Sequence, residues 1–183
     1  LLAISSGSNP ILTALTSAFS NVITLVIFLK TKWTPLTRDY LLSKPWATLL
    51  WVALFTLGTI IPLGFIYEQI GIEMDENTEQ IFASLMKEPW GYVAIGILAP
   101  FAEEVVFRGA VLRTLLGLMS KKNHWVAIMI SAAIFGLVHA NVAQFVNALL
   151  LGLLLGWMYY RTKSLVPGIL LHWVNNTMAY VLS

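Results

Sequence analysis

The feature that most constrains this chain is a series of apolar runs, each about long enough to cross a lipid bilayer as a helix. A helix needs about 20 apolar residues to span a hydrocarbon core about 30 Å thick. Strands of a membrane barrel would instead alternate apolar and polar residues, and these runs are apolar on every face. The chain is therefore predicted to be all-α, a polytopic integral membrane helical bundle of about six transmembrane spans. The expected spans are 11–29, 46–67, 90–120, 124–139, 142–160 and 165–182.

Composition supports the same class of protein. The chain is 58% hydrophobic and only 11% charged, whereas an ordinary soluble domain carries about 25% charged residues. A net charge of +2 gives no reason to expect a nucleic-acid partner. The absence of cysteine excludes disulfides, thiol catalysis and thiolate metal sites. A length of 183 residues fits a single domain, 1–183. Because the chain begins at Leu1 without a methionine, we expect its N-terminus to have been shortened.

The third expected span, 90–120, differs from the others because helix breakers and charges interrupt it. Pro100 lacks a backbone donor, and Glu103-Glu104 and Arg108-Gly109 follow within ten residues. We predict a broken third span, either one interrupted crossing or a helix followed by a shorter tilted one. The stretch just before it, 68–89, is rich in acidic residues and is predicted to lie in water.

The distribution of basic residues predicts an orientation. If the spans alternate in direction, the loops after spans one, three and five lie on one side of the membrane. The opposite side carries only Lys87, so the positive-inside tendency places the basic side in the cytoplasm and the acidic stretch outside. We expect an integral protein of a bacterial plasma membrane. The basic residues of the three loops are Lys30, Lys32, Arg38, Lys44, Lys121, Lys122, Arg161 and Lys163.

Polar residues inside the spans are the candidates for chemistry. A charged side chain at bilayer depth costs about 2.5–3.5 kcal/mol on insertion scales, so the two adjacent glutamates need partners. Arg108 lies four residues after Glu104 on the same helix face and can pair with it. Glu103 points about 100° away and has no local partner. Its candidates are His139 and His172, which lie on two other spans.

Each of these features also has a structural interpretation. A Glu–Arg pair one turn apart is most simply a clamp, and an intramembrane histidine often bonds neighbouring helices. Asn147 is expected to make a helix–helix hydrogen bond or to border the site, and Gly152 with Gly156 indicates a close-packing face. The combination favours function, because an unpaired glutamate, two histidines and Asn176 lie on three spans of a chain with few polar residues.

Three motifs occur in order along the second half of the chain. Glu103-Glu104-Val-Val-Phe-Arg108 has the pattern E-E-x-x-x-R, Phe135-Gly-Leu-Val-His139 has F-x-x-x-H, and His172-Trp-Val-Asn-Asn176 has H-x-x-x-N. Their order and separation resemble the CPBP (Abi) family of intramembrane proteases. That family includes the type II CAAX prenyl endopeptidases and bacterial proteins linked to bacteriocin processing and self-immunity. The resemblance covers about 90–182, the motif-bearing part of the chain.

The resemblance implies an intramembrane endopeptidase whose cleft opens toward the cytoplasmic side. Glu103 and His139 would activate a water, and His172 and Asn176 would donate hydrogen bonds to the oxyanion. Glu104 and Arg108 would support the architecture. The substrate would be a peptide or protein, lipid-modified or not, of CAAX type or from bacteriocin and peptide processing, with membrane lipids as the other partners. These roles suit the chemistry, because fixed donors in a dry site stabilise an oxyanion strongly.

A zinc mechanism is the alternative for the same residues. Glu103, His139 and His172 supply one carboxylate and two imidazoles, a ligand set known for catalytic Zn²⁺. They come from three different spans and lack the H-E-x-x-H pairing that prepares a zinc site on one helix. The sequence therefore favours a mechanism without a cofactor, with zinc as the second hypothesis.

Two other function classes are compatible with the sequence. One is a non-catalytic membrane scaffold or immunity protein that keeps the fold. The other is a proton-coupled transporter that uses Glu103 and the histidines as a relay. A transporter usually contains an internal repeat, and this sequence has none that is recognisable.

Overall fold

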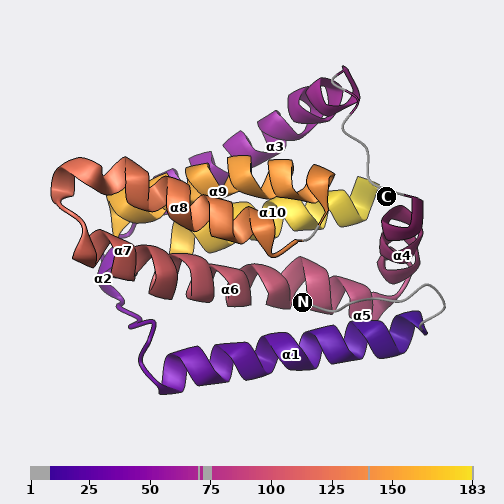
Figure 1. The fold of residues 1–183 in the computed structure, drawn as a ribbon, viewed down its shortest axis with the longest axis horizontal. Coiled ribbons are helices and arrows are strands. Elements are labelled where there is room, and N and C mark those ends of the chain that lie inside the picture. Colours follow the sequence, from indigo (N-terminus) through magenta and orange to yellow (C-terminus); the bar gives the residue numbers. More distant parts are fainter. Residues whose placement is uncertain (1–8, 70, 72–75, 140, 183) are drawn as a thin grey trace.

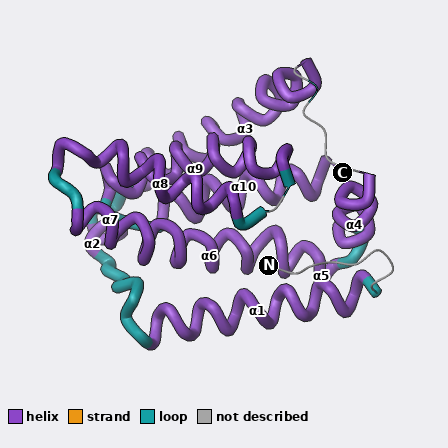
Figure 2. The backbone as a smooth tube through the Cα atoms, viewed as in Figure 1, coloured by secondary structure: helices purple, strands orange, loops and turns teal. Residues whose placement is uncertain are grey.

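The computed structural model describes residues 9–69, 71, 76–139 and 141–182. Every regular element within these residues is helical, which confirms the all-α prediction. The long helices run along the long dimension of the molecule and lie beside one another in a bundle (Figure 1). Loops join them at the two ends (Figure 2). The separate long helices are α1 (Pro10–Lys30), α3 (Trp46–Gln69), α8 (His124–Leu137), α9 (Val142–Thr162) and α10 (Val166–Leu182).

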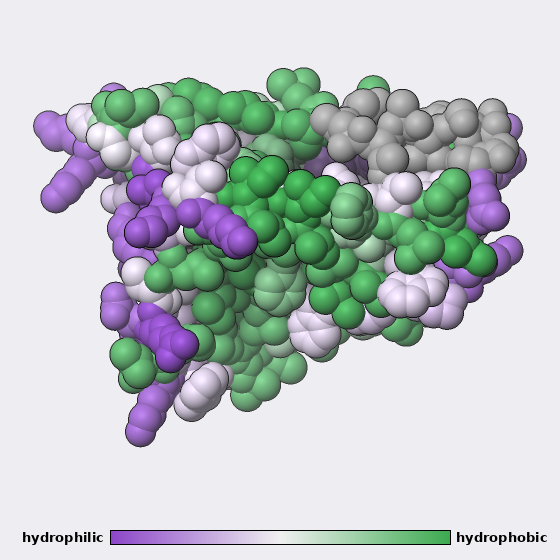
Figure 3. Space-filling view, turned by 90° about the horizontal axis from the view of Figure 1, so that it is seen from below, coloured by the Kyte–Doolittle hydropathy of each residue, from purple (hydrophilic) through white to green (hydrophobic). Residues whose placement is uncertain are grey.

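Helices α1, α3 and α9 are each long and apolar enough to cross a membrane, with 21, 24 and 21 residues in the part of the chain that is described. Helices α8 and α10 are shorter, with 14 and 17 residues. Hydrophobic side chains fill the middle of the face drawn in Figure 3, and hydrophilic ones collect at its two ends. The structure thus supports membrane-spanning helices, and the full number of six crossings stays a prediction.

The expected third span is one composite helix over residues 89–118, in which consecutive helical segments follow one another without a gap. The sequence predicted a break around Pro100 and Arg108-Gly109. The chain instead stays helical there, with one π-helical segment just before Pro100 and a second that contains Arg108 and Gly109. This rod passes through the centre of the bundle (Figure 1). Its segments are α5 (Pro89–Gly91), the π-helix η1 (Tyr92–Leu98), α6 (Ala99–Glu103), the π-helix η2 (Glu104–Leu112) and α7 (Arg113–Leu118).

Short elements occupy the connections. The loop after α1 contains α2 (Asp39–Leu42), the turn before α8 contains the 3₁₀ helix η3 (Lys121–Asn123), and the acidic stretch contains α4 (Glu76–Met86). The loops after α1, α7 and α9 lie at one end of the bundle, and α4 lies at the other end (Figure 1). The basic loops therefore share one end, as alternating spans require.

The ends of the long helices show ordinary capping chemistry. The Asn9 side chain accepts hydrogen bonds from the backbone N–H groups of Ile11 and Leu12 and so caps the N-terminus of α1.

Three helices are followed by a lysine with a left-handed backbone. These are Lys32 after α1, Lys44 after α2 and Lys163 after α9, with φ of 58°, 54° and 54°. Glycine is the usual residue at such positions, because an L side chain is strained there.

Helices α8 and α9 pack closely through small residues, as predicted for Gly152 and Gly156. A Cβ at Gly152 would lie 3.0 Å from the Cα of Ala132, and one at Gly156 would lie 2.9 Å from a methyl of Ile128. The backbones approach because no side chain separates them at these points. This contact confirms the close-packing face and brings the end of α8 beside the composite helix.

Helix α3 is held more loosely than its neighbours. Thr56 is its single buried residue among those described, and its main packing partner is α10. The second half of α3 diverges from the bundle (Figure 1). There the Tyr67 hydroxyl donates to the Asn147 side-chain oxygen at 3.1 Å. Asn147 therefore makes the helix–helix hydrogen bond that the sequence predicted.

Candidate active site

A buried ion pair lies at the centre of the composite helix. Glu104 and Arg108 are each only 1% exposed, and Arg108 Nη1 donates to Glu104 Oε1 at 2.8 Å. Arg108 Nη2 donates to the carbonyl oxygen of Gly152 on α9 at 3.3 Å. The predicted pairing across one helical turn is confirmed. A buried charge pair of this kind is tolerated only when its geometry is good, because both ions have lost their water.

Phe135 on α8 covers this ion pair. The Arg108 guanidinium carbon lies 4.4 Å from the centre of the Phe135 ring, which is a cation–π contact. Arg108 Nε finds no acceptor among the described residues. The Arg108 side chain is thus held by the Glu104 carboxylate, the Gly152 carbonyl and the face of the Phe135 ring.

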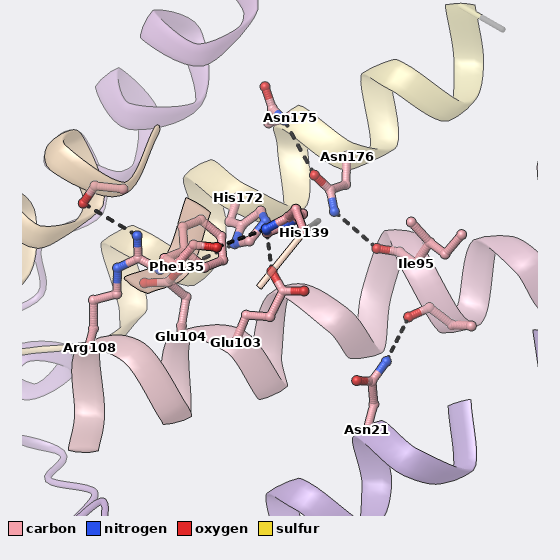
Figure 4. A network of polar contacts seen from close by, with 12 residues as sticks. Asn21, Ile95, Glu103, Glu104, Arg108, Phe135, His139, His172, Asn175 and Asn176 are labelled. Atoms are coloured by element: carbon pink, nitrogen blue, oxygen red, sulfur yellow. Dashed lines mark hydrogen bonds and ion pairs between the residues drawn. The ribbon is translucent and has the colours of Figure 1, made fainter. Parts of the chain in front are cut away.

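His172 on α10 lies between the two glutamates (Figure 4). Its Nδ1 is 3.3 Å from Glu104 Oε1, and its Nε2 is 3.6 Å from Glu103 Oε2. The prediction that Glu103 meets a histidine from another span is therefore confirmed for His172. Sequence reasoning assigned Glu104 to Arg108 alone and missed its contact with His172, because that contact depends on how α10 packs against the composite helix.

The two glutamates differ sharply in exposure. The Glu104 side chain is 1% exposed, whereas the Glu103 side chain is 29% exposed. His172 is also nearly sealed, with 5% of its side chain exposed. Glu103 is therefore the carboxylate of the pair that a water or a substrate can reach.

His139 lies just beyond the end of α8, one turn after Phe135. Its Nδ1 is 2.8 Å from the Phe135 carbonyl oxygen, so Nδ1–H donates, and in the neutral imidazole Nε2 is then the acceptor. The rings of His139 and His172 both contact the Phe135 ring at steep angles, with centroids 5.1 and 5.9 Å away. Phe135 thus borders both imidazoles and forms a wall of the site.

Asn176 lies one turn after His172 and is directed at the composite helix. Its Nδ2 donates to the Ile95 carbonyl oxygen at 3.1 Å, and its Oδ1 accepts from Asn175 at 3.3 Å. One amide hydrogen is engaged with Ile95, and an asparagine amide carries two. The bond to Ile95 fixes the plane of the amide near the site.

Gly168 is a site residue that sequence reasoning missed. A Cβ at this position would lie 2.9 Å from Glu104 Oε2, so a side chain would displace that carboxylate. The available signal was its position one helical turn before His172, which puts both residues on one face of α10. The glycine lets α10 approach closely enough for His172 to reach both glutamates.

The zinc hypothesis remains a second use of the same residues. Among the described residues, no group of three His, Cys, Asp or Glu side chains is already close enough together to hold a metal ion. His172 and His139 each turn Nδ1 to a protein oxygen, of Glu104 and of Phe135, which is also the usual orientation of a histidine that binds zinc through Nε2. The metal-free mechanism therefore stays a prediction.

An apolar hollow of about 220 Å³ lies where α8 ends and α9 begins. Small-molecule sites are larger, about 300–1,000 Å³. The hollow has the size of a large side chain. It is lined by Gly136, Leu137, Asn141, Val142 and Phe145.

The fold and this polar cluster define a class of protein: a helical membrane protein with carboxylates, imidazoles and an amide gathered inside its bundle. The chain belongs to the Rce1-like type II CAAX prenyl endopeptidase family, whose sequence profile matches residues 85–178. That match contains all three motifs, and the resemblance drawn from them is confirmed. No solved structure matches the chain significantly.

Curated relatives come from bacteria, and two of those described here are named as a membrane peptidase or protease. The chain is 30% identical over 142 residues to the "Putative membrane peptidase YdiL" of Bacillus subtilis (strain 168), covering 77% of this chain and 57% of that protein. It is 28% identical over 137 residues to the "Membrane-embedded CAAX protease MroQ" of Staphylococcus aureus (strain USA300), covering 72% and 55%. It is also 28% identical over 171 residues to the "UPF0177 protein YaiF" of Lactococcus lactis subsp. lactis (strain IL1403), covering 87% and 75%. The chain thus spans little more than half the length of the two named as peptidase or protease.

Proposed function

We propose that this protein is an intramembrane endopeptidase that hydrolyses a peptide bond with a water activated by Glu103 and His139. The observation that carries the proposal is the contrast within the glutamate pair. Glu104 is sealed between Arg108 and His172, whereas Glu103 is 29% exposed. A sealed carboxylate suits a structural role, and an accessible one in an apolar bundle suits proton transfer.

In the proposed first step, Glu103 takes a proton from the water, and the water oxygen attacks the peptide carbonyl carbon. His139 orients that water through Nε2, which is left as an acceptor because Nδ1–H donates to Phe135. When the carbon–nitrogen bond breaks, the proton held by Glu103 passes to the leaving amine. The carboxylate is regenerated, and the products are a free acid and a free amine.

Two donors would stabilise the negative charge that develops on the carbonyl oxygen. His172 receives its orientation from Glu104 at Nδ1, and its Nε2, which lies 3.6 Å from Glu103 Oε2, would turn to the oxyanion when the substrate is bound. Asn176 uses one amide hydrogen on Ile95 and keeps the second for the oxyanion. Removing one such donor typically lowers kcat by about 10²–10³.

The proposed mechanism uses no metal, and elemental analysis of active purified protein tests this. We expect substoichiometric zinc and activity that survives a strong chelator. Near-stoichiometric zinc, together with activity that is lost to the chelator and restored by Zn²⁺, would assign Glu103, His139 and His172 to a metal after all.

We also propose the placement in the membrane. The composite helix and five further helices would make six crossings, with the lysine-rich end in the cytoplasm of a bacterial cell. His172 lies six residues from the start of α10 at Val166, about 9 Å from that end of the helix. His139 lies deeper, past the end of α8 that is away from these lysines, so the proposed cytoplasmic opening rests on His172 and on the charge distribution.

The proposed substrate is a peptide or protein segment that reaches the site from the membrane. The hollow between the end of α8 and the start of α9 would take one apolar side chain of the substrate. Pairs of identical peptides, one prenylated at a CAAX cysteine and one unmodified, separate the substrate classes. Preference for the prenylated member would place the protein among the CAAX endopeptidases by activity as well as by family.

The central test is cleavage of such peptides by the full purified chain, with products identified by mass spectrometry. The control is Glu103→Gln, purified in the same detergent. We expect cleavage by the wild type and none above background by the variant. Equal background cleavage by both would favour the non-catalytic scaffold or immunity protein.

A further inference from the structure

The two π-helical segments of the composite helix are held by side chains from elsewhere in the molecule. Asn21 on α1 donates to the Ala94 carbonyl at 3.2 Å, and Asn176 on α10 donates to the Ile95 carbonyl at 3.1 Å. In the second segment, Thr34 donates to the Val105 carbonyl at 2.7 Å, and Ser131 on α8 donates to the Phe107 carbonyl at 3.1 Å. Each donor belongs to a different part of the chain.

The first segment shows why such donors are needed. The Ala99 N–H bonds to the Ala94 carbonyl, five residues earlier, so the chain is in π register there. The next donor in that register would be residue 100, which is a proline and has no N–H. The Ile95 carbonyl is left without its backbone partner, and Asn176 supplies the missing hydrogen bond.

The second segment begins at Glu104, in the middle of the glutamate pair. In a regular α-helix, neighbouring side chains diverge by about 100°. Glu103 and Glu104 nevertheless reach the two nitrogens of one imidazole, at 3.6 and 3.3 Å. The Glu104 N–H bonds to the Pro100 carbonyl four residues earlier, so the register is α up to Glu104 and changes to π in the backbone that carries Glu104 and Arg108.

Thr34 and Ser131 bind this segment where it carries the site. Both side chains are buried, each with 2% exposure. Their acceptors, the carbonyls of Val105 and Phe107, lie in the backbone between Glu104 and Arg108. Thr34 also sits directly against Gly109, where a Cβ would overlap its methyl group at 2.2 Å. A hydroxyl group inserted beside a helix carbonyl is a recognised cause of departure from regular α geometry.

We propose that Thr34 and Ser131 are positioning residues for the reaction. Their hydroxyl groups hold the Val105 and Phe107 carbonyls and thereby maintain the π register of the backbone that places Glu104 and Arg108 beside His172. The proposal rests on the hydrolysis proposed above. Neither residue touches the substrate, so their effect is transmitted through the backbone of η2.

The experiment compares Thr34→Val, which removes the hydroxyl and keeps the shape, with Thr34→Ser, which keeps the hydroxyl. Ser131→Ala is the second variant, and Thr24→Val is the control because its hydroxyl bonds only to Ser20 within α1. We expect kcat to fall about tenfold in Thr34→Val and Ser131→Ala with KM little changed, as loss of one hydrogen bond predicts. Thr34→Ser and Thr24→Val should retain wild-type kcat.

Hydrogen exchange gives a readout that does not depend on activity. Peptides covering 104–112 should exchange faster in Thr34→Val and Ser131→Ala than in the wild type, while Thr34→Ser should match the wild type. Unchanged exchange in both hydroxyl-deleted variants would overturn the proposal, as would equal loss of kcat in Thr34→Val and Thr34→Ser. If the wild type shows no Glu103-dependent cleavage, the proposed hydrolysis fails, and exchange alone decides whether the hydroxyls hold the register.

Discussion

Glu103 and Glu104 are neighbours with the same side chain, and the fold gives them opposite surroundings. Glu104 accepts from Arg108 and contacts His172 in a sealed interior, whereas Glu103 lies at an accessible edge. The sequence motif marks both carboxylates, and their difference in burial supports different proposed roles for them. Replacing each glutamate by glutamine therefore tests the two roles separately.

Glu103→Gln should abolish cleavage and leave the protein stable. The amide keeps the volume and removes the base, whose contribution is about 10²–10⁴ in rate. Glu104→Gln should instead lower thermal stability, because it leaves Arg108 as an uncompensated buried charge at a cost of about 3–5 kcal/mol. Peptide cleavage and melting in detergent measure the two effects. Indistinguishable variants would contradict this division of roles.

Gly168→Ala should damage the site from the opposite helix. Its new methyl would lie 2.9 Å from Oε2 of Glu104, and the other oxygen of that carboxylate, Oε1, is held by Arg108 and His172. We expect a loss of about 1–3 kcal/mol from overpacking and a clear fall in kcat. Gly117→Ala serves as the matched control, since nothing lies within 4 Å of its Cβ. Full activity in Gly168→Ala would show that the carboxylate can move without consequence.

At the scale of the element, the sequence predicts the helices well and their internal register poorly. Apolar runs and charged loops are local signals, and the predicted 142–160 and 165–182 correspond closely to α9 (Val142–Thr162) and α10 (Val166–Leu182). Pro100 indicated a break. In the structure a π-helical segment stands in place of the break, and Asn176 donates a hydrogen bond to its Ile95 carbonyl. These two residues are 81 positions apart, so no local sequence pattern could predict that they pair.

The candidate site divides in the same way. The contact between Glu104 and Arg108 follows from helix periodicity and was predictable from spacing alone. The placement of His172 between both glutamates, and the need for Gly168, require the packing of α10 against the composite helix. The structure joins Glu104 and Arg108 and places His172 against both glutamates. The contacts of His139 and Asn176 are with Phe135, Ile95 and Asn175, so their meeting with Glu103 stays a prediction.

The packing of α8 on α9 yields a third prediction. Gly152→Ala would place a methyl 3.0 Å from the Ala132 backbone and push apart two helices that contact along their length. We expect about 1–3 kcal/mol of destabilisation, seen as a lower melting temperature in detergent. Gly58→Ala on the exposed part of α3 should be neutral or stabilising by up to about 1 kcal/mol, because its Cβ meets nothing within 4 Å. The reverse order of stabilities would disprove close packing at Gly152.

At the scale of the whole molecule, the charge distribution predicts an orientation that labelling can measure. Single cysteines at Glu79 on α4 and at Asn123 before α8 introduce the only thiols of the chain, which has no cysteine of its own. In intact cells, an impermeant reagent should label position 79 and leave 123 unlabelled until the membrane is opened. Labelling of 123 alone would reverse the orientation, and with it the cytoplasmic opening of the site.

Three lysines with a left-handed backbone conformation follow α1, α2 and α9. They affect both the orientation of the protein in the membrane and its stability. Lys32, Lys44 and Lys163 occupy backbone conformations where glycine would avoid a strain of roughly 1 kcal/mol each. Thermal stability and uniform insertion therefore make opposing demands on the same three positions. The triple Lys→Gly variant should melt at a higher temperature and insert as a mixture of two orientations, which the labelling at 79 and 123 would quantify. The strained lysines would then lower the stability of these helix ends, and their charges would ensure that the protein inserts into the membrane in a single orientation.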